Sequence, residues 1–321
     1  MTSVVLPLFN EVDSLAILFG ELDTAFKNQA VEFIFVDDGS HDGSWSVVRK
    51  LAAADPRIKA IRLRRNFGKA AALTAGFSVC TGSIVLTLDA DLQDNPAEVH
   101  RFLKEIESGL DVVSGWKKTR HDPWHKVAPS RLFNWVVSRL TGCQLHDHNC
   151  GFKAYRREVL KEVEIYGELH RFIPVLAFAR GFKVGEIEVN HRARKFGSSK
   201  YGLTRLVKGF LDLMTVRFLT RFRQSPLHIL GTMGLVMLLV GGIGMIYMAG
   251  YWLTHPDPIG SRPLLTYSAT LLGVGAQLLS LGVLAELVTS YNLRPKDTYS
   301  VAEQIGPRDE EASDVIGNPS V

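Results

Sequence analysis

Apolar and polar residues alternate in blocks along the first part of the chain, as strands and helices that follow one another would require. Short apolar runs predict β-strands at 4–6, 31–36, 58–63, 83–88 and 112–116. Between them apolar residues recur at helical spacing, and Asn95, Pro96 and Glu98 predict a helix start with a capping box. This order predicts βαβ units and a mostly parallel sheet that is buried on both faces.

Two long apolar stretches follow in the last third of the chain. Leu227–Leu253 and Leu264–Val288 each exceed the roughly 20 residues that cross a bilayer core, which predicts a transmembrane hairpin. Its flanks are basic and its turn carries one basic residue, Arg262, so the positive-inside rule places both termini in the cytoplasm. We interpret the glycine pairs at 242–244 and 273–275 as close helix packing, because neither follows a strand.

The segments around this hairpin complete the predicted organisation. Apolar and basic residues alternate through 203–226, which favours amphipathic helices in a membrane interface over packed surface helices. The polar, acidic end of the chain is expected to be disordered, and the first eleven residues do not resemble a signal peptide. We predict an α/β domain at 1–202, juxtamembrane helices at 203–226, two transmembrane helices at 227–293 and a cytoplasmic tail at 294–321.

Composition adds two constraints. The formal net charge is only +4, so bulk charge does not indicate a nucleic-acid partner. The three cysteines, Cys80, Cys143 and Cys150, are scattered, which favours free thiols in a reducing compartment over a disulfide framework. His146 and His148 lie between the last two cysteines, but the paired spacing typical of zinc sites is absent, so buried thiols are the preferred interpretation.

The strongest chemical signal is Asp89-Ala90-Asp91, directly after the predicted strand at 83–88. Alternate residues of an extended segment project alike, so both carboxylates can reach one metal ion, and Gln93 has the same parity. Oxygen ligands suit Mg²⁺ or Mn²⁺, and such a cation stabilises the charge on a departing diphosphate. We therefore interpret this segment as a metal and diphosphate site.

Other strand ends carry groups suited to a nucleotide. Asp37 and Asp38 can accept hydrogen bonds from a nucleobase or a ribose, or can cap the helix expected near Ser44. Gly68 and Lys69 open a helix after two arginines, an arrangement that favours an anion, with a solvated turn as the alternative. Because the carboxyl ends of parallel strands share one edge, these groups are expected to surround one ligand.

Basic residues beyond the sheet suggest a second anion near the bilayer surface. One set is Lys117, Lys118, Arg120 and Arg131, and the other is Arg192, Arg194, Lys195 and Lys200, around the glycine and serines at 197–199. An acceptor that is itself a lipid phosphate would fit this position. Attraction to anionic headgroups without chemistry is the alternative.

Several motifs, in order, resemble the family 2 inverting glycosyltransferases of the GT-A fold. They are VVLPLFNE at 4–11, VDDGS at 36–40, NFGKAAAL at 66–73 and LDADLQDNP at 88–96. Three later motifs are similar to the polyprenyl-phosphate glycosyltransferases, which include dolichol-phosphate mannose synthase and the bactoprenol glucosyltransferases. They are DHNCGFKAYRR at 147–157, HRFIP at 170–174 and RKFGSSKYG at 194–202. The resemblance extends from Val4 to Leu293.

This resemblance implies a role for each matching position. The nucleotide-contacting positions are Pro7, Phe9, Glu11 and Asp38, to which the residue patterns add Asp37 and Lys69. The metal and diphosphate positions are Asp89, Asp91 and Gln93, and the acceptor-phosphate positions are Lys117, Arg131, Arg194 and Lys200. Asp147 matches an acidic position close to the reaction centre. Lys117 departs from the arginine often found in the dolichol branch and so lacks a bidentate fork.

The implied activity is transfer of a sugar, with inversion, from a nucleotide-sugar to polyprenyl phosphate, assisted by Mg²⁺ or Mn²⁺. UDP-glucose is the favoured donor because the motifs resemble those of the bactoprenol type. The hairpin also resembles that type, which implies a homotetramer. GDP-mannose, a UDP-aminosugar and modified pentoses stay open. Three other functions are weighed: a processive synthase, which would need a QxxRW motif, a sugar-nucleotide pyrophosphorylase, and a silent membrane scaffold that binds nucleotide-sugar. The intact metal cluster argues against the scaffold.

Overall fold

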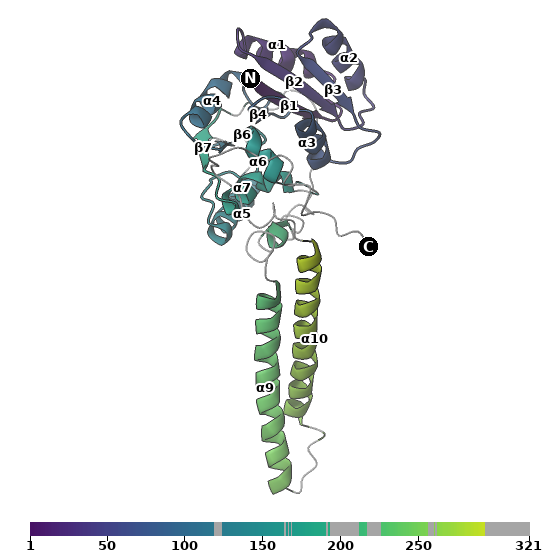
Figure 1. The fold of residues 1–321 in the computed structure, drawn as a ribbon, viewed down its shortest axis with the longest axis vertical. Helices are drawn as coiled ribbons and strands as arrows, with labels where there is room; N and C mark the ends of the chain where they lie inside the picture. Colours follow the sequence, from purple (N-terminus) through teal and green to yellow (C-terminus); the bar gives the residue numbers. More distant parts are fainter. Residues whose placement is uncertain are drawn as a thin grey trace, which may run out of the picture.

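The computed structural model describes residues 1–118, 124–163, 165, 167, 169–190, 192, 212–216, 226–255, 260 and 262–292. The predicted juxtamembrane segment therefore lies outside the described residues except at 212–216 and Pro226, and the predicted tail lies wholly outside them. The α/β part occupies one end of the molecule, and two long helices project from it (Figure 1).

Seven strands form one mixed sheet in the order β3-β2-β1-β4-β6-β5-β7. The strands are β1 (Thr2–Leu8), β2 (Val31–Asp37), β3 (Ile58–Arg62), β4 (Ile84–Thr87), β5 (Val112–Trp116), β6 (Lys153–Arg156) and β7 (Val184–Glu188). All pairs are parallel except those of β6, which runs antiparallel to both β4 and β5. The sequence predicted the parallel pattern correctly, whereas β6 is not among the strands predicted above.

The helices pack on both faces of this sheet, as expected for buried parallel strands. They are α1 (Leu15–Ala25), α2 (Ser44–Ala54), α3 (Lys69–Ser78), η1 (Pro96–Glu98), α4 (Val99–Glu107), α5 (Trp124–Thr141), α6 (Arg157–Glu162), η2 (Leu169–Phe172) and α7 (Ile173–Ala179). Leu18 and Phe102 join one core with β1, β2 and β4, and Leu73 joins Val5 and Ile34 on the opposite face. A Cβ on Gly76 would lie 2.4 Å from Cγ1 of Val5, so glycine lets α3 lie directly on the sheet.

The helix start at Asn95 differs in part from the predicted capping. Asn95 accepts the N–H of Ala97 at 3.2 Å, as expected, but Glu98 binds Asn190 and Arg101 instead of completing a capping box. The first turn is consequently a 3₁₀ turn that leads into α4.

A second, smaller apolar core lies beside the sheet at the end nearest the long helices. Val137 of α5, Phe172 of η2 and Val175 of α7 form it together with Leu213 and Val216 from the helical segment 212–216. This core connects the α/β part to the segment that precedes the long helices.

The long helices are α9 (Pro226–Thr254) and α10 (Pro263–Asn292), each long and apolar enough to cross a membrane. They pack through small residues, because a Cβ on Gly275 would meet the carbonyl oxygen of Gly234 at 2.8 Å. Close packing was predicted for this region, although Gly242 and Gly273 turn out to have nothing within 4 Å. Glu286 accepts the N–H of Leu227 at 3.2 Å and thereby caps the start of α9.

Candidate active site

The candidate site lies where β1, β2 and β4 end. The chain moves from β1 to β2 on one side and later places β4 on the other, so the strand order reverses at β1. In open α/β sheets ligands bind at such switch points, beyond the carboxyl ends of the strands. The predicted nucleotide and diphosphate residues follow these three strands.

Hydrogen bonds join the loop after β1 to the loop after β2. Asn10 has a φ of 55°, which turns the chain, and its N–H donates to Ser40 Oγ at 2.9 Å. The N–H of Glu11 donates to Ser44 Oγ, also at 2.9 Å. Pro7 is buried in β1, while Phe9 and Glu11 are half-buried just beyond it. The structure thus brings the predicted nucleotide residues of β1 beside those of β2.

Asp37 and Asp38 have different surroundings. Asp37 is fully buried, accepts the N–H of Ser40 at 2.9 Å and pairs with Arg62 at 3.4 Å. Asp38 accepts the N–H groups of Phe67 and Gly68 at 2.7 and 2.9 Å. Burial raises the pKa of Asp38, and these two hydrogen bonds only partly offset it.

Neither aspartate caps α2, which was the alternative role considered for them. Its first turn is bound by Asp42, which accepts the N–H of Ser44 at 3.0 Å. Asp38 instead binds the turn that leads into α3. Gly39 makes this arrangement possible, since a Cβ there would lie 2.5 Å from the carbonyl carbon of Arg65. The loop before Lys69 is therefore held against the end of β2.

Lys69 and Asp89 form an ion pair at the centre of the site. Lys69 opens α3, and Asp89 follows β4 with about a third of its side chain exposed. Burial opposes ionisation of Asp89, yet the charges of Lys69 and Lys117 outweigh it and lower the carboxyl pKa to about 2. Asp89 is therefore an anion at neutral pH.

Asp91 and Gln93 are half-buried in the turn that follows. Leu92 between them has a φ of 61°, a strained conformation for a non-glycine residue, and its side chain is buried. Asp91 Oδ1 accepts the N–H of Gln93 at 3.2 Å. The oxygen donors fit a hard divalent cation. Since no three His, Cys, Asp or Glu side chains gather as a metal site among the described residues, phosphate oxygens and water would complete its shell.

Behind this turn, Asp94 pairs with Lys117 at 2.8 Å. Asp94 is 1% exposed and Lys117 is 14% exposed. Burial opposes the charge on Lys117, but Asp94 outweighs this effect and raises the pKa of the ammonium group. Sequence reasoning gave Asp94 no role, although it directly follows Gln93 in the motif. The predicted acceptor-phosphate residue Lys117 thus has a carboxylate partner within the protein.

The segment 147–153 packs against Asp89 from the other side. A Cβ on Gly151 would lie 2.5 Å from Asp89 Oδ2, so only glycine leaves room for this carboxylate. Asp147 is 1% exposed, and its Oδ1 accepts the N–H of Asn149 at 3.0 Å. The antiparallel strand β6 places Lys153 between Thr87 and Ser114.

Lys153 is a buried cation that sequence reasoning missed. Its Nζ donates to the carbonyl oxygens of Cys150 and His148. Burial lowers the pKa of Lys153 to about 8. In the sequence it is one of three basic residues in the run Lys153–Arg157, and nothing distinguishes it from the other two. His170 is half-buried, with its Nδ1 atom inaccessible to solvent, and desolvation lowers its pKa well below the ordinary value.

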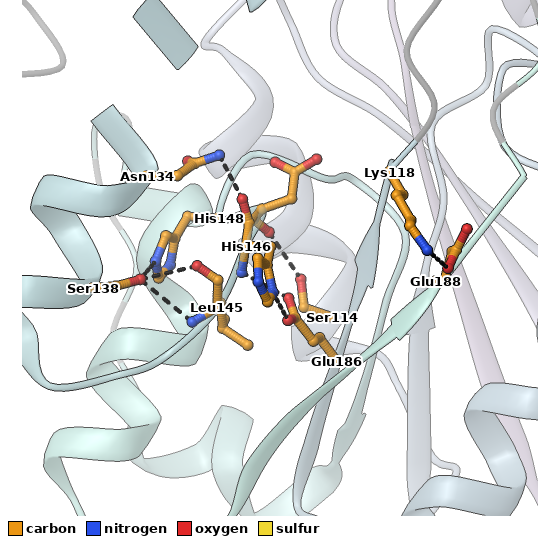
Figure 2. Close-up of polar contacts among 10 residues, drawn as sticks. Ser114, Lys118, Asn134, Ser138, Leu145, His146, His148, Glu186 and Glu188 are labelled. Carbon is orange, nitrogen blue, oxygen red and sulfur yellow. Dashed lines mark hydrogen bonds and ion pairs between the residues drawn. The ribbon is translucent and has the colours of Figure 1, made fainter. Parts of the chain in front are cut away.

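The residues considered for zinc face different partners. The ring of His146 stacks on that of Trp116, with 4.3 Å between the ring centroids. His146 also pairs with Glu186, whereas Nε2 of His148 lies 3.0 Å from Ser138 Oγ (Figure 2). Cys80, Cys143 and Cys150 are buried free thiols, as predicted. Burial raises the pKa of Cys150 to about 12, so its thiol is protonated beside the site.

Three predicted acceptor-phosphate residues remain. Arg131 is exposed on α5. Arg194 and Lys200, predicted to bind the acceptor phosphate, lie outside the described residues.

Comparison with known proteins extends these observations. The chain is 35% identical over 293 residues to dodecaprenyl-phosphate galacturonate synthase of Rhizobium johnstonii, covering 89% of this chain and 87% of the relative. It is 36% identical over 313 residues to undecaprenyl-phosphate 4-deoxy-4-formamido-L-arabinose transferase of Serratia proteamaculans, covering 95% and 94%.

A solved structure shows the same fold. Glucosyl-3-phosphoglycerate synthase from Mycobacterium tuberculosis, crystallised with Mn²⁺, uridine diphosphate and phosphoglyceric acid, superposes with a TM-score of 0.54 at 18% identity. The match covers 68% of this chain and 78% of that one. The family described as glycosyl transferase family 2 matches residues 3–164, which include all of the site from β1 to β6. With these matches and this sheet, the chain belongs to glycosyltransferase family 2.

Proposed function

We propose that this enzyme transfers a glycosyl group from a nucleotide-sugar to polyprenyl phosphate, with inversion, at the cytoplasmic surface of a membrane. The observation that carries the proposal is the ion pair of Lys69 and Asp89, set between Asp91 and the segment 147–153 at the strand-order switch. Two relatives similar over almost their whole length are named for transfer to dodecaprenyl or undecaprenyl phosphate.

The donor would lie across the ends of β1, β2 and β4. Pro7, Phe9, Glu11 and Asp38 would contact the nucleoside, and Asp37 would support this turn from beneath. Lys69 would contact the diphosphate, since its ammonium group and the N-terminus of α3 both favour an anion.

Asp91 and Gln93, with Asp89 beside them, would hold the divalent cation, Mg²⁺ or Mn²⁺. When bound, the cation stabilises negative charge on the departing diphosphate. Asp89 is ionised at neutral pH because its carboxyl pKa is about 2, so its charge is available to the cation and to Lys69.

The proposed reaction is a single in-line displacement. A phosphate oxygen of the acceptor forms a bond to the anomeric carbon while the bond to the diphosphate oxygen breaks. The second pKa of a phosphate monoester is about 6, so the nucleophile is largely a dianion at pH 7 and needs no strong base. Asp147 would then position the acceptor, while Lys117, Arg131, Arg194 and Lys200 would offset the repulsion between two anions.

The sugar is the open part of the proposal. UDP-glucose was favoured from the sequence, but the two relatives are named for galacturonate and 4-deoxy-4-formamido-L-arabinose. We therefore place these two sugars beside glucose as donors to be tested, with UDP as the favoured nucleotide. GDP-mannose and UDP-aminosugars serve as further members of the panel.

The long helices α9 and α10 would anchor the enzyme in the cytoplasmic membrane as a hairpin, with the catalytic domain and both termini in the cytoplasm. Their length and apolar composition support membrane association. A homotetramer is the proposed assembly.

The deciding experiment uses purified enzyme in nanodiscs that contain undecaprenyl phosphate. Radiolabelled donors from the panel are added with Mg²⁺ or Mn²⁺, and label is followed into the organic phase, with EDTA as a control. Metal-dependent transfer from one donor is expected and would name the sugar. If donors bind but none is transferred, the glycosyltransfer proposal is overturned in favour of a silent scaffold.

The variant Asp91→Asn separates catalysis from binding. We expect it to bind the nucleotide-sugar but to lose turnover, because it removes one charged ligand of the cation. Full activity in this variant would show that the metal assignment is wrong.

A further inference from the structure

The outer face of α5 combines apolar and basic side chains. Leu132 and Trp135 are 62% and 64% exposed, and Arg131 and Arg139 are exposed with them. At 100° per residue these four positions fall within about 100° of arc on one side of the helix. The opposite side, with Asn134 and Val137 among others, is buried in the second core. Hence α5 buries one side in the second core and exposes the apolar residues Leu132 and Trp135 on the other side.

Exposed apolar side chains are concentrated around this helix. Outside α9 and α10, the large exposed hydrophobics among the described residues are Met1, Ile17, Phe67, Leu132, Trp135, Phe178 and Met214. Four of these seven come from α5, α7 and the segment 212–216, which share the second core. Isolated exposed hydrophobics are ordinary, but a group of them on adjoining elements marks a contact surface.

This surface lies at the membrane end of the domain. Figure 1 shows α5 and α7 at the end of the α/β part that faces α9 and α10. Glu286 binds the N–H of Leu227 there, which places a carboxylate at the domain end of the hairpin. A 29-residue helix is about 43 Å long, whereas the hydrocarbon core is about 30 Å thick, so the helix ends extend into the interfacial zones.

From these observations we infer that the outer face of α5 lies in the cytoplasmic interface of the bilayer, with Trp135 and Leu132 among the lipid headgroups. Tryptophan is favoured at this depth, and arginine side chains extend to lipid phosphates while their stems lie on apolar surface. The occupant is an anionic bilayer surface, because Arg131 and Arg139 flank the apolar pair and both are positive. The inference rests on the proposed membrane insertion of α9.

Such docking would fix the orientation of the catalytic domain over the membrane. The inner side of α5 contacts the segment beside the site, since Asn134 Nδ2 donates to the carbonyl oxygen of His146 at 2.9 Å (Figure 2). His146 directly precedes Asp147. The helix would therefore hold the site at a constant height above the phosphate of a membrane-embedded acceptor.

The test is spin labelling of the full chain in nanodiscs with and without phosphatidylglycerol. The three native cysteines are buried, so a nitroxide can be placed selectively at Leu132→Cys or Trp135→Cys. Ile17→Cys is the matched control, because Ile17 is an exposed apolar residue on α1. Leu239→Cys, midway along α9 and 59% exposed, reports membrane insertion itself.

We expect the labels at 132 and 135 to be accessible to oxygen but shielded from a water-soluble nickel chelate. The label at 17 should stay accessible to the nickel chelate. Arg139→Gln should weaken the effect mainly in nanodiscs that contain phosphatidylglycerol. Nickel access at 132 and 135 equal to that at 17 would overturn the inference, provided Leu239→Cys is shielded. If Leu239→Cys is itself accessible, the proposed membrane insertion fails instead.

A second copy of the chain is the competing occupant. It would shield the labels from both oxygen and nickel, and would broaden the spectrum in a way that dilution with unlabelled protein removes. That result would also overturn the inference.

Discussion

Replacing Gly151 with alanine tests how the segment 147–153 supports Asp89. The substitution adds one methyl group at a residue whose backbone conformation an alanine can adopt, since Gly151 is not among the glycines with positive φ. That methyl carbon would lie 2.5 Å from Asp89 Oδ2 and 2.7 Å from its Cγ. The carboxylate must therefore move.

The size of the movement follows from the contact distance. Ordinary van der Waals contact begins near 3.4 Å, so the carboxylate must shift by about 0.9 Å away from Gly151. A shift of about 1 Å in a catalytic group can lower the rate by about 100-fold. We expect Gly151→Ala to lower kcat by about this factor, because the ion pair with Lys69 and the approach to the cation both depend on where Asp89 lies.

The assay is the initial rate of label transfer to polyprenyl phosphate at saturating donor and acceptor. Gly20→Ala is the matched control, since a Cβ at Gly20 on α1 meets nothing within 4 Å. The double variant Gly151→Ala with Asp89→Ala tests whether the effect of Gly151→Ala on kcat depends on the Asp89 carboxylate. If Gly151 acts through Asp89, adding Gly151→Ala to Asp89→Ala should cause little further loss.

Wild-type kcat in a correctly folded Gly151→Ala enzyme would refute this reasoning. A large fall in the melting temperature of Gly151→Ala would instead show that the added methyl group destabilises the fold, and Asp89→Ala, which removes the clashing carboxylate, should then restore part of that stability.

Three further predictions follow from other contacts. Burial opposes ionisation of Glu32, but Lys59 and three further hydrogen bonds lower its pKa from 4.5 to about 2. The ionised carboxylate should therefore add about 3 kcal/mol to the free energy of unfolding above pH 4.5, and this contribution should be lost as the pH falls toward 2. The difference in melting temperature between wild type and Glu32→Gln should shrink across that range. Asp94→Leu and Lys117→Met should each lower the melting temperature, because each strands a buried charge, and the double variant should recover part of the loss. In detergent, Gly275→Ala should weaken the hairpin while Gly273→Ala does not, which thermal unfolding will detect.

The central strands β1, β2 and β4 were predictable because they are buried and mostly apolar. Val31–Asp37 is buried at every position, so neither face of the strand requires alternating polar residues. The strand can therefore be recognised in the sequence as a mainly apolar run. Lys153–Arg156 has only four residues, two of them basic, and nothing in its spacing marks it as a strand. Its place between β4 and β5 depends on tertiary contacts.

The candidate site was predictable to the extent that its residues follow strands directly. Asp89 and Asp91 satisfied that rule. The partners of these residues did not, because Asp94 and Lys117 are 23 positions apart and meet only in the folded sheet. Asp38 likewise binds the start of α3, although the nearer helix along the chain is α2. Sequence spacing identifies candidate groups, whereas their ion pairs require the fold.

The position of β6 also governs when the enzyme can become active during its synthesis. β4 and β5 lie on either side of β6 and have no hydrogen-bonded register with each other. A nascent chain that ends before Lys153 therefore has Asp89 and Asp91 at the end of an incomplete sheet. In such a chain β5 is not yet joined to that sheet through β6. Domains form as units while the ribosome adds about 5–20 residues per second. Closure of the sheet and assembly of the candidate site thus become a single late event, and under the proposed function a fragment released before β6 would not transfer sugar.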